Sequence, residues 1–168
     1  YAPEFVEVEK ATEDRIQKLL NIKGKRSVDS IHKELGHICW EYIGMGRTKE
    51  GLETGIKKID ELRKEFDTNL FVPGSRDGLN VELDKAIHLD DFITMGKLIA
   101  YDALSREESC GGHFREEHQT EEGEAKRDDK NFFYVGCWEY KGEGNAPELI
   151  KEPLEYEAIK VQTRNYKN

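Results

Sequence analysis

SVDSIHKELGHICWEYIGMGRTKEGLETGIKKIDELRKEF, residues 27–66, contains two stripes of apolar side chains at the three- and four-residue spacing of an α-helix. Ser27 and Thr48 can cap the N-termini of the two helices, and Gly44 can end the first one. The first stripe consists of Val28, Ile31, Leu35, Ile38 and Tyr42, and the second of Leu52, Ile56, Ile59, Leu62 and Phe66. The stretch therefore predicts two amphipathic helices joined by a short connection.

A third helix is predicted after residues 67–78, which are rich in helix-breaking residues. Asn80 can cap this helix. Its apolar positions are expected to be Val81, Ile87, Phe92, Met95, Ile99 and Leu104. Together the three helices predict an antiparallel three-helix bundle, like that of a spectrin repeat, over residues 27–110. The expected core includes Ile31, Leu35, Ile56, Ile59, Ile87 and Ile99.

The segments on either side of the bundle are predicted to be smaller. Residues 1–26 form a lead segment with one short helix, from Thr12 to Leu20. Residues 111–168 form an extended docking segment followed by a small β-hairpin, whose strands are predicted at 132–140 and 154–166 around a turn region at 142–147. The fold class is therefore mainly α. Four large aromatic residues are expected to be packing residues: Trp40, Phe132, Phe133 and Trp138.

Composition and charge exclude several classes of protein. The 26 lysines and arginines are outnumbered by 35 acidic residues, so a net charge of −9 predicts no nucleic-acid partner. A mean hydropathy of −0.80 without a long apolar run predicts no direct membrane insertion. The three cysteines, an odd number at wide spacing, are expected to be free thiols in the cytoplasm. Because the chain begins at Tyr1, without an initiator Met or a targeting segment, we expect a fragment of a longer protein.

Common catalytic and cofactor motifs are absent from the sequence. There is no G-x-G-x-x-G between a strand and a helix, no P-loop, no H-E-x-x-H and no G-x-S-x-G, so we predict no catalytic, cofactor-binding or metal-binding residue in this chain. Cys110, His113 and His118 could supply three zinc ligands, but a structural zinc site usually has four. We therefore favour hydrogen bonds between these side chains and the backbone at a docking surface.

The most distinctive stretch is REESCGGHFR at 106–115, followed by RDDKNF at 127–132. Gly111 and Gly112 allow positive φ and close backbone contact, while arginine and carboxylate side chains can form charge-assisted hydrogen bonds. The stretch therefore predicts a specific docking surface. Its docking residues are predicted to be Arg106, Glu108, Ser109, Gly111, His113, Arg115, Arg127, Asp128 and Asp129.

These nine residues resemble, position by position, the signature R-x-E-S-R-G-A-H-x-R … R-D-D-x-x-W near the end of the flavoprotein subunit of succinate dehydrogenases and fumarate reductases. Upstream, GRTKEGL at 46–52 and LDK at 83–85 are similar to the family's helical segment. Three positions depart from the signature: Cys110 stands for the usual Arg, Gly112 for Ala and Phe132 for Trp. The related L-aspartate oxidases share the glycine turn, but the Arg-Asp-Asp triplet is more similar to the succinate and fumarate enzymes.

The resemblance implies that the chain is the C-terminal helical domain of such a subunit. In the parent enzyme, FAD and the residues that interconvert succinate and fumarate lie upstream, so the fragment alone is expected to be inactive and to hold no cofactor. Its implied partners are the FAD-binding domain and the iron–sulfur subunit, and its implied location is cytoplasmic, held at the inner membrane through partner subunits. Arg106, Arg115 and Arg127 would then bridge the domain boundary and be solvent-exposed in the isolated domain. The alternative is a stand-alone helical protein-interaction module without redox activity.

Overall fold

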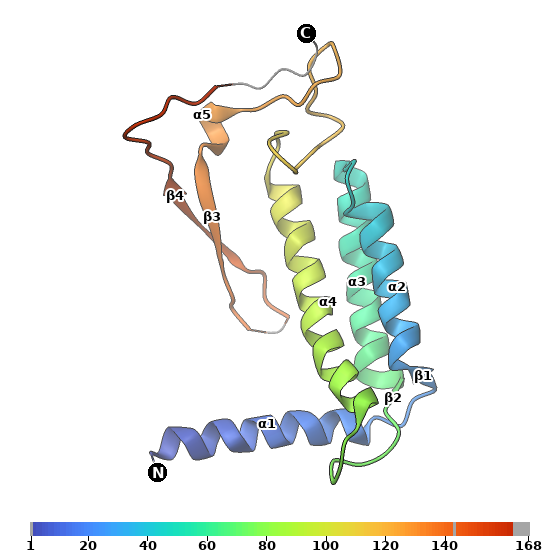
Figure 1. Cartoon of the computed structure of the whole chain (residues 1–168). Coiled ribbons are helices and arrows are strands. Elements are labelled where there is room, and N and C mark those ends of the chain that lie inside the picture. Colours follow the sequence, from blue (N-terminus) through green and yellow to red (C-terminus); the bar gives the residue numbers. More distant parts are fainter. Residues whose placement is uncertain (1, 143, 163–168) are drawn as a thin grey trace.

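A computed structural model describes residues 2–142 and 144–162. Three long helices run side by side as a bundle, a fourth lies across one end of it, and a two-stranded hairpin lies beside it (Figure 1). The elements in chain order are α1 (Pro3–Asn21), β1 (Arg26–Ser27), α2 (Val28–Tyr42), α3 (Lys49–Asn69), β2 (Leu70–Phe71), α4 (Val81–Ser105), α5 (Asp129–Phe132), β3 (Tyr134–Glu139) and β4 (Glu148–Pro153). The predicted fold class, a mainly helical chain with a three-helix bundle and a small hairpin, is confirmed.

All three predicted N-caps of the bundle are confirmed. The side chains of Ser27, Thr48 and Asn80 accept hydrogen bonds from backbone N–H groups three residues further on. Each cap satisfies one of the donors that the first turn of a helix leaves free, which fixes the residue at which the helix begins. The helix boundaries in the bundle are therefore set by local chemistry that the sequence displays.

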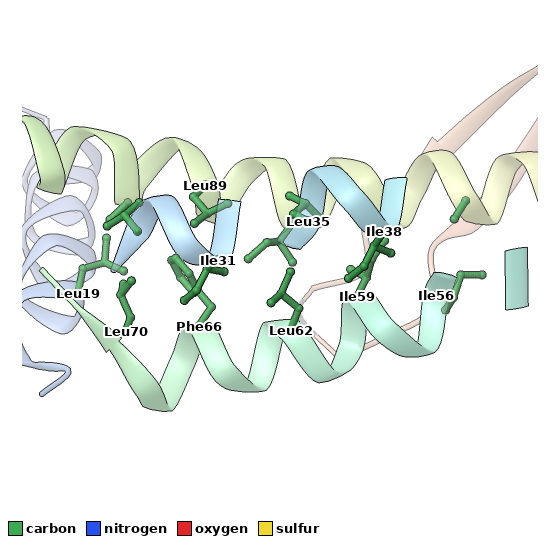
Figure 2. Packing of buried hydrophobic residues seen from close by; sticks show 14 of the residues in the cluster. Leu19, Ile31, Leu35, Ile38, Ile56, Ile59, Leu62, Phe66, Leu70 and Leu89 are labelled. Atoms are coloured by element: carbon green, nitrogen blue, oxygen red, sulfur yellow. The ribbon is translucent and has the colours of Figure 1, made fainter. Parts of the chain in front are cut away.

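The core lies between the three bundle helices and extends to the end of α1 (Figure 2). It consists mostly of branched aliphatic side chains, together with Phe66 and with alanines of α4. The members that Figure 2 labels are Leu19, Ile31, Leu35, Ile38, Ile56, Ile59, Leu62, Phe66, Leu70 and Leu89. The four predicted core residues of α2 and α3 are at most 9% exposed, as expected.

The apolar face of α4 differs from the prediction. Phe92, Met95 and Ile99 are 47%, 56% and 46% exposed, and Val81 is also exposed. Small residues of the same helix turn toward the bundle instead: Ala86, Gly96, Ala100 and Ala103 are buried, together with Leu83, Leu89 and Ile93. Ile99 is thus not a core residue, and Ile87 packs only partly against the core. The physical reason is that small side chains let α4 approach its neighbours closely, which a search for large apolar residues does not detect.

A parallel pair of two-residue strands, which was not predicted, closes the end of the bundle near α1. In this pair Arg26 lies opposite Leu70, and Ser27 lies opposite Phe71. Gly24, two residues before Arg26, donates its N–H to the Leu70 carbonyl at 2.9 Å. A Cβ at Gly24 would lie 1.9 Å from the Asn69 carbonyl group, so this close approach of two backbones requires glycine.

The lead helix is longer than predicted. It extends from Pro3 to Asn21 instead of beginning at Thr12, whose hydroxyl donates to the Val8 carbonyl inside the helix and does not cap it. Only Leu19 and Leu20, near the end of α1, are buried. The division into segments 1–26, 27–110 and 111–168 stays a prediction.

The hairpin is confirmed, but its second strand is not where it was predicted. β4 covers 148–153, directly after the predicted turn region, and pairs antiparallel with β3 so that Cys137 lies opposite Ile150. Residues 154–162 form no strand, and the rest of the predicted strand lies outside the described residues. Trp138 is partly buried, and its indole N–H donates to Asp102 at 2.8 Å. Trp40, by contrast, is 85% exposed, so it is not a packing residue.

Two further expectations concern the surface. The three cysteines are free, as predicted, and Cys110 and Cys137 are exposed. Among the described residues, none of the helices is long and apolar enough to cross a membrane.

The inverted faces of α4 can be tested by mutation. Ala100→Leu is expected to lower the free energy of unfolding by about 1–3 kcal/mol, because it puts a larger side chain at a position that is fully buried. Ile99→Ala is expected to change it by about 1 kcal/mol or less, because the side chain is already half in water. Urea denaturation measures both values, and a larger loss for Ile99→Ala would mean that the assignment of the faces is wrong.

Candidate functional site

The signature residues lie at the end of the bundle where α4 stops and the chain turns back. Cys110 and His113 exchange two backbone hydrogen bonds, 2.8 and 3.1 Å long, around Gly111 and Gly112. Only the first of these glycines has a positive φ, +60°, which is the pattern of a type II′ turn. Gly111 is therefore the residue that this reversal of the chain requires.

Arg115, which follows the turn, is the most deeply buried charged residue of the site. It is 2% exposed, and its guanidinium donates to the carbonyl of Ala103 at 3.0 Å and to those of Leu104 and Arg106 at 3.4 Å. The carbonyls of Ala103 and Leu104 belong to the last turn of α4, where they have no partner within the helix and carry partial negative charge, and Arg106 is the residue that follows the helix. Arg115 thus caps the C-terminus of α4.

Two neighbours hold Arg115 in this position. The Ser109 hydroxyl, fully buried, accepts from the Arg115 N–H at 2.9 Å and donates to the Arg115 carbonyl at 3.1 Å. The Glu117 carboxylate accepts from the Arg115 side chain at 3.2 Å and also from the backbone N–H of Lys49, the first residue of α3. Partial burial opposes ionisation of Glu117, but these donors outweigh it and lower the pKa of the carboxyl group. The pair therefore joins the negative end of α4 to the positive end of α3.

His113 connects the turn to the segment between α2 and α3. Its Nε2 lies 3.0 Å from the Arg106 carbonyl, and its Nδ1 lies 2.8 Å from the Arg47 guanidinium. Since arginine can only donate, Nδ1 accepts and Nε2 carries the proton, which makes the imidazole neutral. Burial lowers the pKa of His113, and the charges of Arg47 and Arg115 lower it further, against the opposing effect of the Arg106 carbonyl.

The backbone reinforces this connection. The N–H of Arg47 donates to the Phe114 carbonyl at 3.1 Å, and the N–H of Glu116 donates to the Arg47 carbonyl at 2.8 Å. The Arg47 side chain also donates to the carbonyls of Ile43 and Gly44, at the end of α2. One segment after the turn thus binds the C-terminal ends of α2 and α4 and the N-terminus of α3.

Arg106 and Glu108 attach the hairpin to the bundle. Glu108 is 3% exposed and accepts from the Arg106 guanidinium at 2.8 Å and from the Asp128 backbone N–H at 2.9 Å. Arg106 also donates to the carbonyls of Phe132 and Tyr134, and its guanidinium lies over the Tyr134 ring. The start of β3 is thereby fixed against the end of α4.

The Arg-Asp-Asp triplet lies further out. Arg127 pairs with Asp129 at 2.6 Å, and the Asp129 side chain is 52% exposed. Asp128 accepts from the backbone N–H of Asn131 and so begins α5. These residues form the accessible part of the predicted docking set.

The expectation that three arginines are exposed in the isolated domain is wrong, since none of the three side chains is more than 22% exposed. The side chains of Arg115 and Arg106 are 2% and 19% exposed, because they bind carbonyls and carboxylates of this same chain. Arg127, at 22%, is the most accessible of the three. Helix-end carbonyls were predicted as partners of these arginines across the domain boundary. Arg115 does bind such carbonyls, but they belong to this domain.

The zinc alternative is not supported by the geometry of its ligands. Both ring nitrogens of His113 are engaged, by Arg47 and by the Arg106 carbonyl. Across residues 2–142 and 144–162 there is no group of three His, Cys, Asp or Glu side chains that could hold a metal ion. Nothing in the structure explains why Cys110 replaces the usual arginine.

Two residues of the network were not predicted. Arg47 lies in GRTKEGL, which is similar to the family's helical segment, but no pattern in the neighbouring sequence indicates that its side chain binds His113. Glu117 stands in an acidic stretch where no pattern separates it from its neighbours. Both become recognisable only when the fold brings the ends of α2, α3 and α4 together.

Comparisons with known proteins define the class of this bundle and its polar end. The profile described as fumarate reductase flavoprotein C-term matches residues 32–166. The fumarate reductase flavoprotein subunit of Proteus vulgaris is 32% identical over 149 residues, which are 89% of this chain and 23% of that protein. A chloroplastic L-aspartate oxidase of Nicotiana tabacum is 38% identical over 85 residues, 50% of this chain and 13% of that one.

A solved structure gives the same fold. The quinol fumarate reductase of E. coli superposes with a TM-score of 0.74 at 23% identity and covers 97% of this chain and 27% of its own. The class of protein is thus a C-terminal helical domain of a flavoprotein. The chain belongs to the family of fumarate reductase flavoprotein C-terminal domains and spans about a fifth to a quarter of the length of its first curated relatives.

The structural weight of Arg115 can be measured. Arg115→Met is expected to lower the free energy of unfolding by about 3–5 kcal/mol, because it takes the guanidinium donor from the carbonyls at the end of α4 and the charged partner from Glu117. Arg127→Met is the matched control and is expected to cost about 1 kcal/mol or less, because the partner of Arg127, Asp129, is half exposed and the ion pair is not buried. Thermal or urea unfolding compares the two variants, and equal losses would contradict the role of Arg115.

The lowered pKa of His113 predicts a stability that depends on pH. Below the unfolded pKa of about 6.5, the unfolded chain takes up a proton that the folded chain does not. Stability is therefore complete above this pH and falls as the pH drops toward the lower folded pKa. His113→Gln, which keeps an acceptor and a donor, is expected to flatten this fall, whereas exposed His37→Gln is not. Urea midpoints between pH 5 and 8 test this, and identical profiles for His113→Gln and the unaltered chain would refute it.

Proposed function

We propose that this chain is the C-terminal helical domain of a flavoprotein subunit that takes part in the interconversion of succinate and fumarate. In this proposal the preceding part of the subunit binds FAD and performs the chemistry, while this domain holds no cofactor and is inactive by itself. The observation that carries the proposal is the Arg115 network. The signature residues 106–115, which resemble those of the succinate and fumarate enzymes, close one end of the bundle.

The role of the domain is to be a scaffold. The path of the chain at this end of the bundle is fixed by three buried residues, Glu108, Ser109 and Arg115, and by the partly buried Arg106 and His113. In the proposal, the surface that they support contacts the neighbouring FAD-binding domain and the iron–sulfur subunit.

The outer members of the docking set have a different task. Gly111, Arg127 and Asp129, and Asp128 through its side chain, are the residues proposed to reach across the domain boundary, although the Asp128 backbone N–H donates to Glu108. We propose a cytoplasmic location, with attachment to the inner membrane only through partner subunits. No nucleic acid is a partner, because the net charge of −9 repels a polyanion.

Fumarate reductase is favoured over L-aspartate oxidase by the extent of the similarity. Only 19 of the 168 residues lie outside the match to the Proteus vulgaris subunit, so that match includes both the bundle and β3. The 85 residues shared with the tobacco oxidase are too few to span the bundle and the hairpin together. The hairpin and its attachment through Arg106 therefore support the first family.

Purification of the natural protein tests this function. An antibody raised against the 168-residue chain is used to isolate the protein from cells that encode it. We expect a polypeptide about four times as long, as in the Proteus vulgaris relative, that contains bound flavin and reduces fumarate with an artificial electron donor. The isolated 168-residue chain is expected to do neither. A natural polypeptide of only this length, without flavin, would instead support the stand-alone interaction module.

A further inference from the structure

We propose that the cleft between the bundle and the hairpin is a binding site for a small, uncharged aromatic molecule that carries a hydroxyl or carbonyl oxygen. Such a ligand is not part of the proposed function, and its binding is tested separately. The signature residues do not form this cleft, which is lined by α3, by the middle of α4 and by the hairpin.

The first observation is the cleft itself. Its volume is about 480 Å³, within the range of about 300–1,000 Å³ that small-molecule sites occupy. On the bundle side it is lined by Ile59 of α3 and Ile93 of α4, which are 0% and 1% exposed. The hairpin, which lies beside α4 in Figure 1, lines it from the other side. Three elements that are distant in the sequence thus surround one space with an apolar base.

The second observation is a set of aromatic side chains contributed by both sides of the cleft. Trp138 in β3 and Tyr140 directly after it are two residues apart, a spacing that places side chains on one face of a strand. Tyr101 contributes a ring from α4. The indole N–H of Trp138 donates to Asp102 at 2.8 Å, which holds that ring in place. Because aromatic rings attract one another when stacked or edge to face, these walls favour a flat aromatic ligand.

The charges in the cleft cancel one another. Its charged lining residues are Asp60, Arg63, Asp67 and Lys97, two of each sign. Lys97 pairs with Asp60 inside the cleft, whereas Arg63 and Asp67 pair with residues outside the lining. A charged ligand would lose hydration on entering and find no unpaired opposite charge to compensate for it. The cleft therefore favours an uncharged molecule.

Donors without an acceptor are present in the same cleft. The Lys97 ammonium group can donate three hydrogen bonds, and among the described residues its one acceptor is Asp60. The Tyr101 hydroxyl has no hydrogen-bond partner in the part of the chain that the structure describes. Lys97 Nζ lies 5.7 Å from the centre of the Tyr101 ring, so the two side chains are neighbours. An oxygen of the ligand can accept from them, and a few such polar contacts orient a largely apolar ligand.

Binding of naphthol tests the proposal, with naphthoate and naphthylmethylammonium as probes that have the same rings and a charge of either sign. Equilibrium dialysis measures the dissociation constants, both for the natural protein purified with the antibody and for the 168-residue chain. We expect naphthol to bind the chain at least several-fold more tightly than either charged probe. In Trp40→Phe, Trp138 is the one remaining tryptophan of the chain, and its fluorescence is expected to change when naphthol binds.

A substitution on the hairpin side locates the site. Tyr140→Ala removes an aromatic side chain that is 67% exposed, so it hardly affects folding, and we expect it to weaken naphthol binding about fivefold. Tyr156→Ala is the same change at an exposed residue outside the lining and is expected to leave binding unchanged. In the natural protein, the binding assigned to the cleft is the part that Tyr140→Ala removes.

A substitution on the bundle side tests the selection by charge. Lys97→Met leaves Asp60 without its cation, so we expect the preference to reverse and the ammonium probe to bind more tightly than naphthol. Lys58→Met is the matched control, because Lys58 also lies 5.7 Å from the centre of a tyrosine ring, that of Tyr42, but outside this cleft. It is expected to leave the order of the three probes unchanged.

Three results would overturn the proposal. If Tyr140→Ala and Lys97→Met bind the three probes like the unaltered chain, the cleft is not the site. If all three probes bind the unaltered chain equally, the ligand class is wrong. If the chain binds naphthol but Tyr140→Ala removes no binding from the natural protein, another part of that protein fills the cleft. None of these results bears on the proposed function, which depends on flavin and fumarate reduction by the natural protein.

Discussion

The guanidinium group of Arg115 is the constraint on which the end of the bundle depends. A buried cation is tolerated only when its donors find acceptors, and here the acceptors are carbonyls of the last turn of α4 together with Glu117. Those carbonyls are free because α4 ends at Ser105, and Arg115 returns to them, with Glu117 beside it, because the chain reverses at Gly111. The length of the helix, the type of turn and the position of the carboxylate are therefore coupled through one side chain.

This coupling joins three helices that belong to different parts of the sequence. Glu117 receives the first N–H of α3, and Arg47 binds the last carbonyls of α2 while it donates to His113. Each member uses charge or polarity that a helix end presents, with cations at C-termini and an anion at an N-terminus. The apolar core fixes the distance between the helices, and this polar layer fixes how far each one extends relative to the others.

The sequence predicts those parts of the bundle that depend on interactions between residues close together in the chain. It does not predict the interior, where the place of each side chain depends on the side chains of the other helices. Ser27, Thr48 and Asn80 act on N–H groups three residues away, so their role is visible in the sequence. The buried face of α4 depends on which side chains α2 and α3 leave room for, and small residues such as Ala100 carry no such signal. The position of the second strand was predicted wrongly for a similar reason. The pairing of Ile150 with Cys137 depends on both strands and the turn between them, so neither segment alone indicates it.

The candidate site shows the same division. The signature identified nine residues without showing that its arginines act inside the domain, because spacing alone does not tell whether a guanidinium finds a carbonyl of its own chain or of another. A buried charged network of this kind adds little net stability compared with an apolar one, but it tolerates fewer arrangements, since any shift leaves a charge unpaired. For a domain that we propose to support chemistry located elsewhere, this matters more than stability, because Arg115 and Arg106 hold the polar end and the hairpin in one geometry.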